Sequence, residues 1–128
     1  MVGVDLLRVS RVVDLASKDK KNKVFTKAEI AYANTKSNTI ASEEEFSQRD
    51  NTIAGFFCAK EAFLKALGLG LGDYFSLNEI EVSHHKSGQP FIVRTNKIDK
   101  YLSDIQKSEI NLSISHDGGI SIAVVEII

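Results

Sequence analysis

The sequence predicts an α+β fold in which an antiparallel sheet packs beside one long central helix. Residues 110–128 alternate in polarity around Asp117-Gly118-Gly119, which is typical of a β-hairpin, and residues 80–93 form a second such pattern around Lys86-Ser87-Gly88. Between these hairpins and the N-terminus, apolar residues recur at helical spacing up to Leu67. The 128 residues show no repeat and no linker, so we expect one domain spanning residues 1–128.

The N-terminal residues predict a strand and then a helix. Residues 2–4 are apolar and read as a short buried strand that ends at Asp5. The helical spacing of apolar residues that follows predicts a first helix over residues 6–16.

Capping signals predict the next elements. Phe25, Thr26 and Glu29 have the spacing of a hydrophobic staple and capping box, which opens a short helix at Thr26. The polar segment 34–50 leads into the long helix, which should begin between Ser42 and Asp50 and end near Leu67, where Gly68 stops it. A weakly amphipathic helix is expected over residues 97–106, and the histidine pair at 84–85 is expected to be exposed beside its turn.

Composition excludes several classes of protein. The net charge of −1 argues against general nucleic-acid binding, and no stretch approaches the roughly 20 apolar residues of a membrane span. Asp5, Arg8 and Arg11 interrupt the N-terminal apolar run, so it is not a signal peptide. The single cysteine, Cys58, excludes an internal disulfide, and we expect a cytoplasmic protein.

The long helix carries charges that its apolar faces do not explain. One side of its helical wheel is bulky and the other is built from small residues, which predicts two packing partners. Lys60 lies in the middle of the bulky side, while Glu61 and Lys65 form an i,i+4 pair at its edge. The ordinary interpretation is a surface ion pair with a snorkelling lysine. The alternative is that Glu61 binds a divalent cation and the lysines bind an anion, because buried charges need partners.

Asp5 is a second carboxylate that could serve such a site. At the end of a strand it could cap the following helix, or it could bind a ligand there. Mg²⁺ takes one or two carboxylates together with phosphate oxygens and water. Asp5 and Glu61 with lysines nearby therefore have the composition of a Mg²⁺–phosphate site.

The chain resembles the small 4′-phosphopantetheinyl transferases that act as holo-[acyl-carrier-protein] synthases. The resemblance covers nearly the full length and includes GVDLLRVSR, FTKAE, SGQPF and NLSISHDGGISIAVV. Its most specific part is AGFFCAKEAFLKALGLG, which contains the pattern G-x-x-x-A-K-E-A-x-x-K-A from Gly55 to Ala66.

This resemblance implies the reaction and its residues. The 4′-phosphopantetheine arm of coenzyme A (CoA) would move to a serine hydroxyl of apo acyl carrier protein, releasing adenosine 3′,5′-bisphosphate. Asp5 and Glu61 match the residues that hold Mg²⁺, and Lys65 matches a lysine that contacts the pyrophosphate. Lys60 matches the lysine beside the metal-binding glutamate and is expected to reach across a subunit contact. Positions near the CoA phosphates and adenine are matched by Gly68, His116 and Pro90.

The resemblance also implies a homotrimer with its active sites between subunits, and an acidic carrier protein as partner. Residues 1–27 contain seven Lys or Arg against three Asp, a local charge of +4. We expect Arg8 and Arg11, both assigned to the first helix, to form the docking surface.

Two departures from the family pattern keep other functions open. Phe56 stands where many members have Arg, and Leu69 stands where many have Thr or Ser. Both changes remove a possible phosphate contact, although backbone N–H groups of the 68–72 loop could still bind anions. The alternatives are therefore a Mg²⁺-dependent hydrolase of CoA pyrophosphate or phosphoesters, and an inactive CoA-binding subunit.

Overall fold

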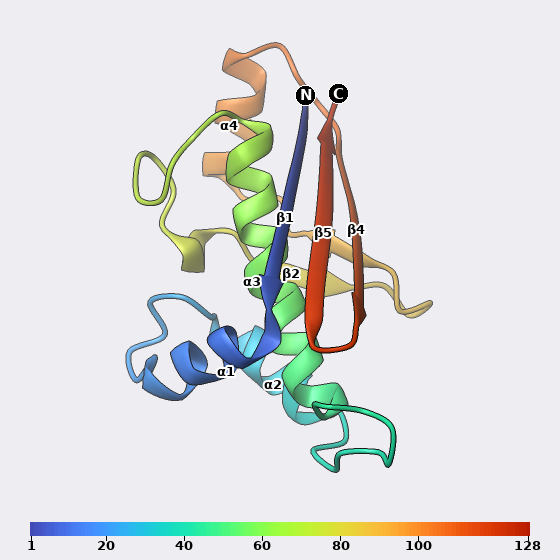
Figure 1. The fold of residues 1–128 in the computed structure, drawn as a ribbon. Helices are drawn as coiled ribbons and strands as arrows, with labels where there is room; N and C mark the ends of the chain where they lie inside the picture. The colour runs from blue at the N-terminus through green and yellow to red at the C-terminus, as the bar shows by residue number, and fades with distance from the viewer.

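A three-stranded antiparallel sheet and the long helix α3 form the centre of the fold (Figure 1). The computed structural model describes residues 1–128. The sheet has the strand order β1-β5-β4, so that β5 lies between the two outer strands, and a smaller two-stranded sheet consists of β2 and β3. In chain order the elements are β1 (Val2–Arg8), α1 (Val9–Lys18), α2 (Lys27–Asn34), α3 (Gln48–Ala66), a 3₁₀ turn (Leu77–Glu79), β2 (Val82–His84), β3 (Pro90–Ile92), α4 (Asn96–Asp104), β4 (Ile110–Asp117) and β5 (Ile120–Ile127). The predicted α+β class is confirmed.

The first strand is longer than its sequence pattern predicts. β1 continues through Asp5 to Arg8 because it pairs along its whole length with β5, from Val2 opposite Glu126 to Arg8 opposite Ile120. The predicted helix over 6–16 is therefore wrong at its start, and α1 begins at Val9. Asp5 lies in the middle of the strand and does not cap a helix.

The small face of α3 allows β1 to pack directly on the helix. A Cβ atom at Gly3 would lie 2.1 Å from the carbonyl oxygen of Ala62 and 2.3 Å from the backbone nitrogen of Ala66, so only glycine fits there. Cys58, Ala62 and Ala66 are buried beneath the sheet. The predicted division of the helix into a bulky side and a small side is confirmed, and both sides are covered within one chain.

Both ends of α3 have clear capping signals. The side chain of Ser47 accepts a hydrogen bond from the backbone of Asp50 at the N-terminus. At the C-terminus, Gly68 N–H donates to the carbonyl of Lys65 and Leu69 N–H donates to that of Leu64, which is the Schellman arrangement. Gly68 has φ +72°, so the predicted glycine stop is confirmed.

A buried ion pair ties α2 to α3. The predicted capping box is present: Thr26 and Glu29 exchange side-chain and backbone hydrogen bonds. The same Glu29 carboxylate accepts from Lys60 Nζ at 2.8 Å and from the backbone N–H of Val82 at 2.8 Å. Both side chains of the ion pair have 0% exposure.

The chain termini lie side by side at one end of the sheet (Figure 1). The Met1 ammonium donates to the carbonyl of Ile127, and Ile127 N–H donates to that of Met1. At the opposite end, Gly118 and Gly119 form the two-residue turn between β4 and β5, both with positive φ. The two predicted hairpins, β2–β3 and β4–β5, are confirmed, and so is the helix between them, α4, which runs from Asn96 to Asp104.

The outer face of the three-stranded sheet is apolar where β1 and β5 form it. Val2, Val4 and Leu6 are 65%, 49% and 64% exposed on β1, so this strand is not buried on both faces as predicted. Val4 pairs with Val124, and Leu6 pairs with Ile122, which extends the apolar surface onto β5. None of the helices combines the length and the apolar character that a membrane crossing requires.

Candidate active site

Four of the predicted site residues line one cavity. Asp5 from β1 and both Glu61 and Lys65 from α3 border a cavity of about 660 Å³, together with Arg11 from α1. Glu61 and Lys65 are one turn apart on the helix, and Asp5 reaches them because β1 packs directly on α3. The fold therefore brings these side chains to one cavity, and their roles in catalysis stay a prediction.

Asp5 is held by two donors on different sides. Its Oδ1 atom accepts a hydrogen bond from Lys65 Nζ at 3.0 Å, and its side chain is only 12% exposed. Cys58 Sγ lies 3.5 Å from Oδ2 and 3.2 Å from the backbone oxygen of Asp5. Burial, followed by the charge of Asp5, raises the pKa of the Cys58 thiol to about 12. The thiol is therefore protonated and serves as a weak hydrogen-bond donor.

Lys65 pairs with Asp5 and makes no hydrogen bond to Glu61. The hydrogen bond to Asp5 is the main reason that the pKa of Lys65 is raised. The predicted i,i+4 ion pair on the helix surface is therefore replaced by a contact between helix and strand. Lys65 is a protonated, half-exposed cation at the mouth of the cavity.

The surroundings of Glu61 disfavour its charged form. Burial, and then the negative charge of Asp5, raise the pKa of Glu61, while Lys65 and Arg11 act in the opposite direction. Two carboxylates close enough to repel each other in a partly buried position favour a bound cation. The raised pKa of Glu61 beside Asp5 therefore supports a metal site between these two carboxylates.

The donor set fits a hard divalent cation that keeps other ligands. No group of three or more His, Cys, Asp or Glu side chains in residues 1–128 could hold a metal ion. A cation between Asp5 and Glu61 would therefore have two protein carboxylates, with its remaining positions filled by phosphate oxygens and water. Mg²⁺ is commonly bound in that way.

Lys60 lies outside this cavity, contrary to the prediction that it binds the CoA phosphates or crosses a subunit contact. Its ammonium donates to Glu29, to the carbonyl of Leu77 at 2.9 Å and to that of Ile80 at 2.6 Å. A lysine ammonium has three donors, and all three are used within the chain. Burial lowers the pKa of Lys60, against the opposing charge of Glu29. Its role is structural.

The loop after α3 also differs from its predicted role. The N–H groups of Gly68 and Leu69 are used by the helix cap, and that of Gly70 donates to the Asp73 side chain. These three donors are therefore not free to bind a phosphate. Gly68 itself is exposed, with open space where a side chain would lie.

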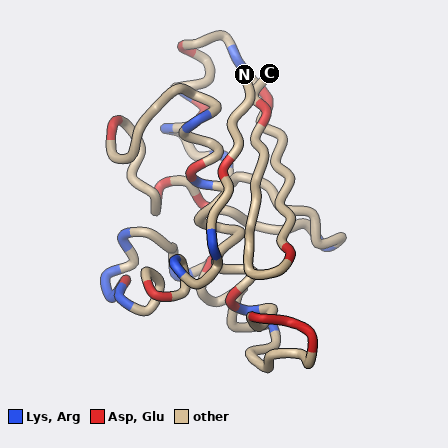
Figure 2. Tube along the Cα trace, viewed as in Figure 1, with Lys and Arg blue, Asp and Glu red and all other residues tan.

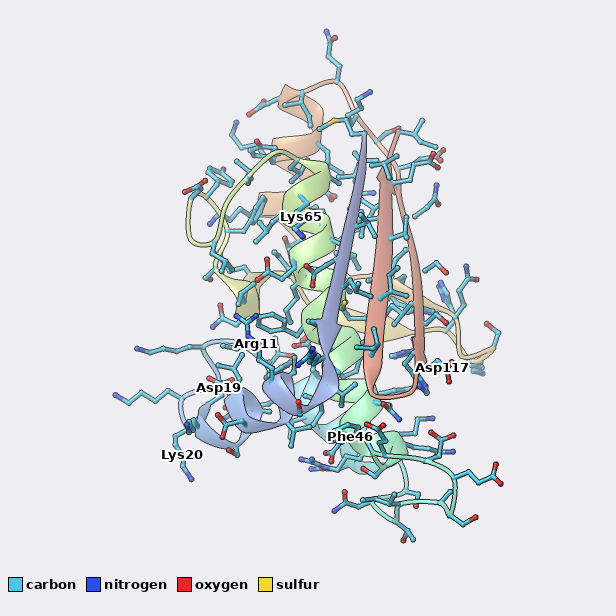
Figure 3. All side chains as sticks on the ribbon, in the orientation of Figure 1. Arg11, Asp19, Lys20, Phe46, Lys65 and Asp117 are labelled. Carbon is cyan, nitrogen blue, oxygen red and sulfur yellow. The ribbon has the colours of Figure 1, made fainter.

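Pro90 and His116 line a different cavity, of about 260 Å³. This cavity shares no residue with the one that holds Asp5. Asp5 and His116 belong to the two outer strands of the sheet, with β5 between them. Figure 3 shows Lys65 and Arg11 to the left of β1, and Asp117, the neighbour of His116, to the right beyond β5. The predicted CoA-binding residues are thus divided between two sides of the subunit.

Three residues of the second cavity were not predicted as site residues. The Tyr32 and His84 rings are stacked, with centroids 4.0 Å apart, and Lys36 Nζ lies 5.0 Å from the centroid of Tyr32. His84 is half-buried and not exposed as predicted. No sequence pattern links these positions, because α2, the loop after it and β2 supply one residue each.

The two predicted docking arginines are not on the same helix. Arg8 is the last residue of β1, in the alternating positions of the outer sheet face, whereas Arg11 is on α1 and lines the cavity of Asp5. Figure 2 shows Lys or Arg positions on α1 and the loop after it, and an acidic stretch in the loop before α3. The basic surface therefore lies on the side of the Asp5 cavity.

Comparisons with known proteins agree on one family. Residues 1–125 match the family described as the 4′-phosphopantetheinyl transferase superfamily. A holo-[acyl-carrier-protein] synthase of Nautilia profundicola is 37% identical over 125 residues, covering 98% of this chain and 96% of that one. The corresponding synthase of Finegoldia magna is 38% identical over 123 residues, covering 95% and 90%.

Solved structures show the same fold. The Helicobacter pylori synthase in complex with coenzyme A has a TM-score of 0.78 and 28% identity, covering 99% of both chains. The Bacillus anthracis synthase, solved with CoA (3′,5′-ADP), has a TM-score of 0.73 and 26% identity, covering 98% of this chain and 92% of that one.

Proposed function

The chain belongs to the 4′-phosphopantetheinyl transferase superfamily, and on that basis we infer that its transfer reaction takes place at Asp5, Glu61 and Lys65. The reaction moves the 4′-phosphopantetheine group from CoA to a serine hydroxyl of apo acyl carrier protein. The observation that carries the assignment is the cavity in which two mutually repelling carboxylates lie beside a protonated lysine.

Each of these residues has a distinct task. The serine oxygen attacks the phosphorus that carries the pantetheine arm, and the bond to the bridging pyrophosphate oxygen breaks. Negative charge develops on the departing adenosine 3′,5′-bisphosphate. Lys65 is protonated and half-exposed, so it can approach this oxygen and neutralise the charge. Such reactions depend mainly on positioning and electrostatic stabilisation.

Asp5 and Glu61 would hold a Mg²⁺ ion. When bound, the ion would neutralise the phosphate oxygens as a Lewis acid. Its binding would also relieve the repulsion that raises the pKa of Glu61. Lys65, which donates to Asp5 Oδ1 at 3.0 Å in this structure, is the side chain at the same site that would contact the phosphate oxygens of the substrate.

The complete site is formed between subunits of a trimer. Two features support this assembly. The outer sheet face exposes Val4, Leu6 and Val124 to solvent, and such an apolar patch is typical of an interface. In addition, one subunit carries Asp5 and His116 on opposite outer strands, so a neighbour can supply the half that each side lacks.

The acidic carrier protein docks beside Arg11. This arginine lines the reaction cavity together with Leu15 and Lys18, which combine basic and apolar contacts at its rim. Arg8 lies on the outer sheet face and would be near the subunit contact instead. The single cysteine fits a reducing compartment, and on that basis a cytoplasmic location stays a prediction.

One assay distinguishes this function from its alternatives. The protein is incubated with CoA, Mg²⁺ and apo carrier protein, and the molecular mass of the carrier protein is measured by mass spectrometry. We expect a mass gain of one phosphopantetheine, and Asp5→Asn and Glu61→Gln should each remove most of the activity. CoA breakdown without carrier would indicate a hydrolase, and CoA binding without turnover would indicate an inactive binding subunit. Near-normal turnover of either variant at limiting Mg²⁺ would contradict the ligand assignment.

The assembly is tested separately by analytical ultracentrifugation. Leu6→Lys on the outer face should shift the trimer to monomers and lower the activity. A monomeric wild-type protein with full activity would contradict the assembly.

A further inference from the structure

Cys58, Glu61 and Lys65 lie along one side of α3, because spacings of three and seven residues fall on the same face of a helix. Two of them contact the Asp5 carboxylate on the neighbouring strand: Lys65 at Oδ1 and Cys58 at Oδ2. Cys58 has 0% exposure and does not line the reaction cavity. It therefore cannot touch the substrate, and any effect it has on the reaction must act through Asp5.

The Cys58 thiol has one hydrogen and three oxygen atoms within reach. Burial raises its pKa to about 12, so the hydrogen is present at neutral pH. Sγ lies 3.2 Å from the backbone oxygen of Asp5, 3.4 Å from that of Ser121 and 3.5 Å from Asp5 Oδ2. The oxygen that receives the hydrogen decides whether the thiol acts on the Asp5 carboxylate or only on the sheet backbone.

The two backbone oxygens already have donors in the ladder between β1 and β5. Met1 and Ile127 exchange hydrogen bonds where this ladder begins. Bonded pairs recur at every second residue of an antiparallel ladder. The register places Asp5 at an even spacing from Met1 and Ser121 at an even spacing from Ile127, so both belong to bonded pairs. Their carbonyl oxygens therefore accept strand N–H groups.

The Oδ2 atom of Asp5 has no donor besides Cys58. It belongs to a charged group, and hydrogen bonds to an ionised acceptor are stronger than those to a neutral one. The thiol hydrogen is therefore directed to Oδ2. Because the carboxylate torsion of an aspartate is intrinsically broad and two-fold, such a contact is what selects the oxygen that faces the cavity.

The contacts on the two carboxylate oxygens lie on different sides. Oδ1 is bound by Lys65, which is half-exposed at the mouth of the cavity, whereas Oδ2 is bound by the buried thiol. We propose that Cys58 is a positioning residue for Asp5: its thiol holds Oδ2, so that Oδ1 is presented to a cation between Asp5 and Glu61. This inference rests on the proposed function, because that function assigns the cation to these two carboxylates.

Binding of Mn²⁺ alone, followed by the EPR signal of the free ion, tests the inference without turnover. Mn²⁺ prefers the same carboxylate ligands as Mg²⁺. Cys58→Ala should weaken Mn²⁺ binding about tenfold, the lower end of what a lost hydrogen bond to a metal ligand causes, because a thiol is a weak donor. Cys58→Ser keeps a donor and should bind close to the wild type. Cys58→Val fills the space without a donor and should match the alanine variant, which keeps the test valid if the alanine protein does not fold.

Ser121→Ala is the matched control. Its hydroxyl is buried beneath the same sheet beside Cys58, but it makes no hydrogen bond. This variant should bind Mn²⁺ like the wild type. In the transfer assay, Cys58→Ala should raise the Mg²⁺ concentration that gives half the maximal rate, while kcat at saturating Mg²⁺ stays nearly unchanged. A merely structural role would lower kcat or the folded fraction and leave the Mg²⁺ dependence as it is.

Two results would overturn the inference: Mn²⁺ binding by Cys58→Ala that equals that of the wild type, or binding by Cys58→Ser as weak as that of the alanine variant. Failure of the proposed function gives a different result. An Asp5→Asn protein that binds Mn²⁺ like the wild type would refute the ligand assignment itself. If Asp5→Asn loses the ion while both Cys58 variants keep it, only the positioning role is refuted.

Discussion

Replacing Glu29 with Gln should destabilise the protein by about 3–5 kcal/mol, because it leaves the Lys60 ammonium buried without a negative partner. Both side chains have 0% exposure, and Lys60 Nζ lies 2.8 Å from Glu29 Oε1. Small domains are stable by only about 5–15 kcal/mol in total. The substitution should therefore remove a large part of the stability even though the new side chain has nearly the same shape.

The hydrogen bonds at Glu29 show why the amide cannot replace the carboxylate. Oε1 accepts from Thr26 N–H and from Lys60, and Oε2 accepts from Val82 N–H. A glutamine has one acceptor oxygen, so its NH₂ group must face a donor in either orientation. At least one of these donors then loses its partner in the protein interior, which costs about 1–3 kcal/mol by itself.

Urea unfolding followed by circular dichroism measures the loss. Lys60→Met should be similarly harmful because it leaves Glu29 unpaired, and the double variant should be more stable than the sum of both losses predicts. A Glu29→Gln protein within about 1 kcal/mol of the wild type would refute the argument. The folded fraction of Lys60→Met should keep its KM for CoA, and a raised KM would return Lys60 to the list of phosphate ligands.

Three further predictions concern the strand–helix contact, the metal site and the docking surface. Gly3→Ala should lower the stability by about 1–3 kcal/mol, as measured by thermal unfolding, because its Cβ would meet helix backbone at 2.1 Å; an unchanged Tm would contradict this packing. Glu61→Gln should raise the Tm of the metal-free protein at neutral pH, because the folded state raises the pKa of this carboxyl and so disfavours its charge; the gain should disappear below the ordinary pKa of 4.5, where both states are protonated. Arg11→Glu should raise the KM for carrier protein severalfold and reduce its salt dependence, with a smaller effect for Arg8→Glu, and equal effects would contradict the assignment of Arg11 to the cavity.

The elements whose signals are local were predictable from the sequence. The capping box at Thr26, the stop at Gly68 and the turn at Gly118 each depend on residues within one or two turns of chain. The length of β1 depends on β5, which lies at the other end of the sequence. Because Leu6 and Val9 suit both a strand that ends and a helix that begins, periodicity alone could not locate the boundary.

The site shows the same division. Glu61 and Lys65 were predicted from one specific motif and Asp5 from the matching N-terminal stretch, and the fold brings all three to one cavity. Lys60 was assigned wrongly because its partner Glu29 lies in another helix, and nothing in the motif indicates that contact.

The pairing of the first strand with the last one has a consequence for biosynthesis. β1 lies at the edge of its sheet and is bound only by β5, so it has no partner until residues 120–127 have left the ribosome. Until then the small face of α3 and the apolar residues of β1 are exposed to other chains. Such long-range pairing slows folding compared with a helical protein of the same length. A nascent chain halted before Ile120 should therefore be a substrate for chaperones and proteases.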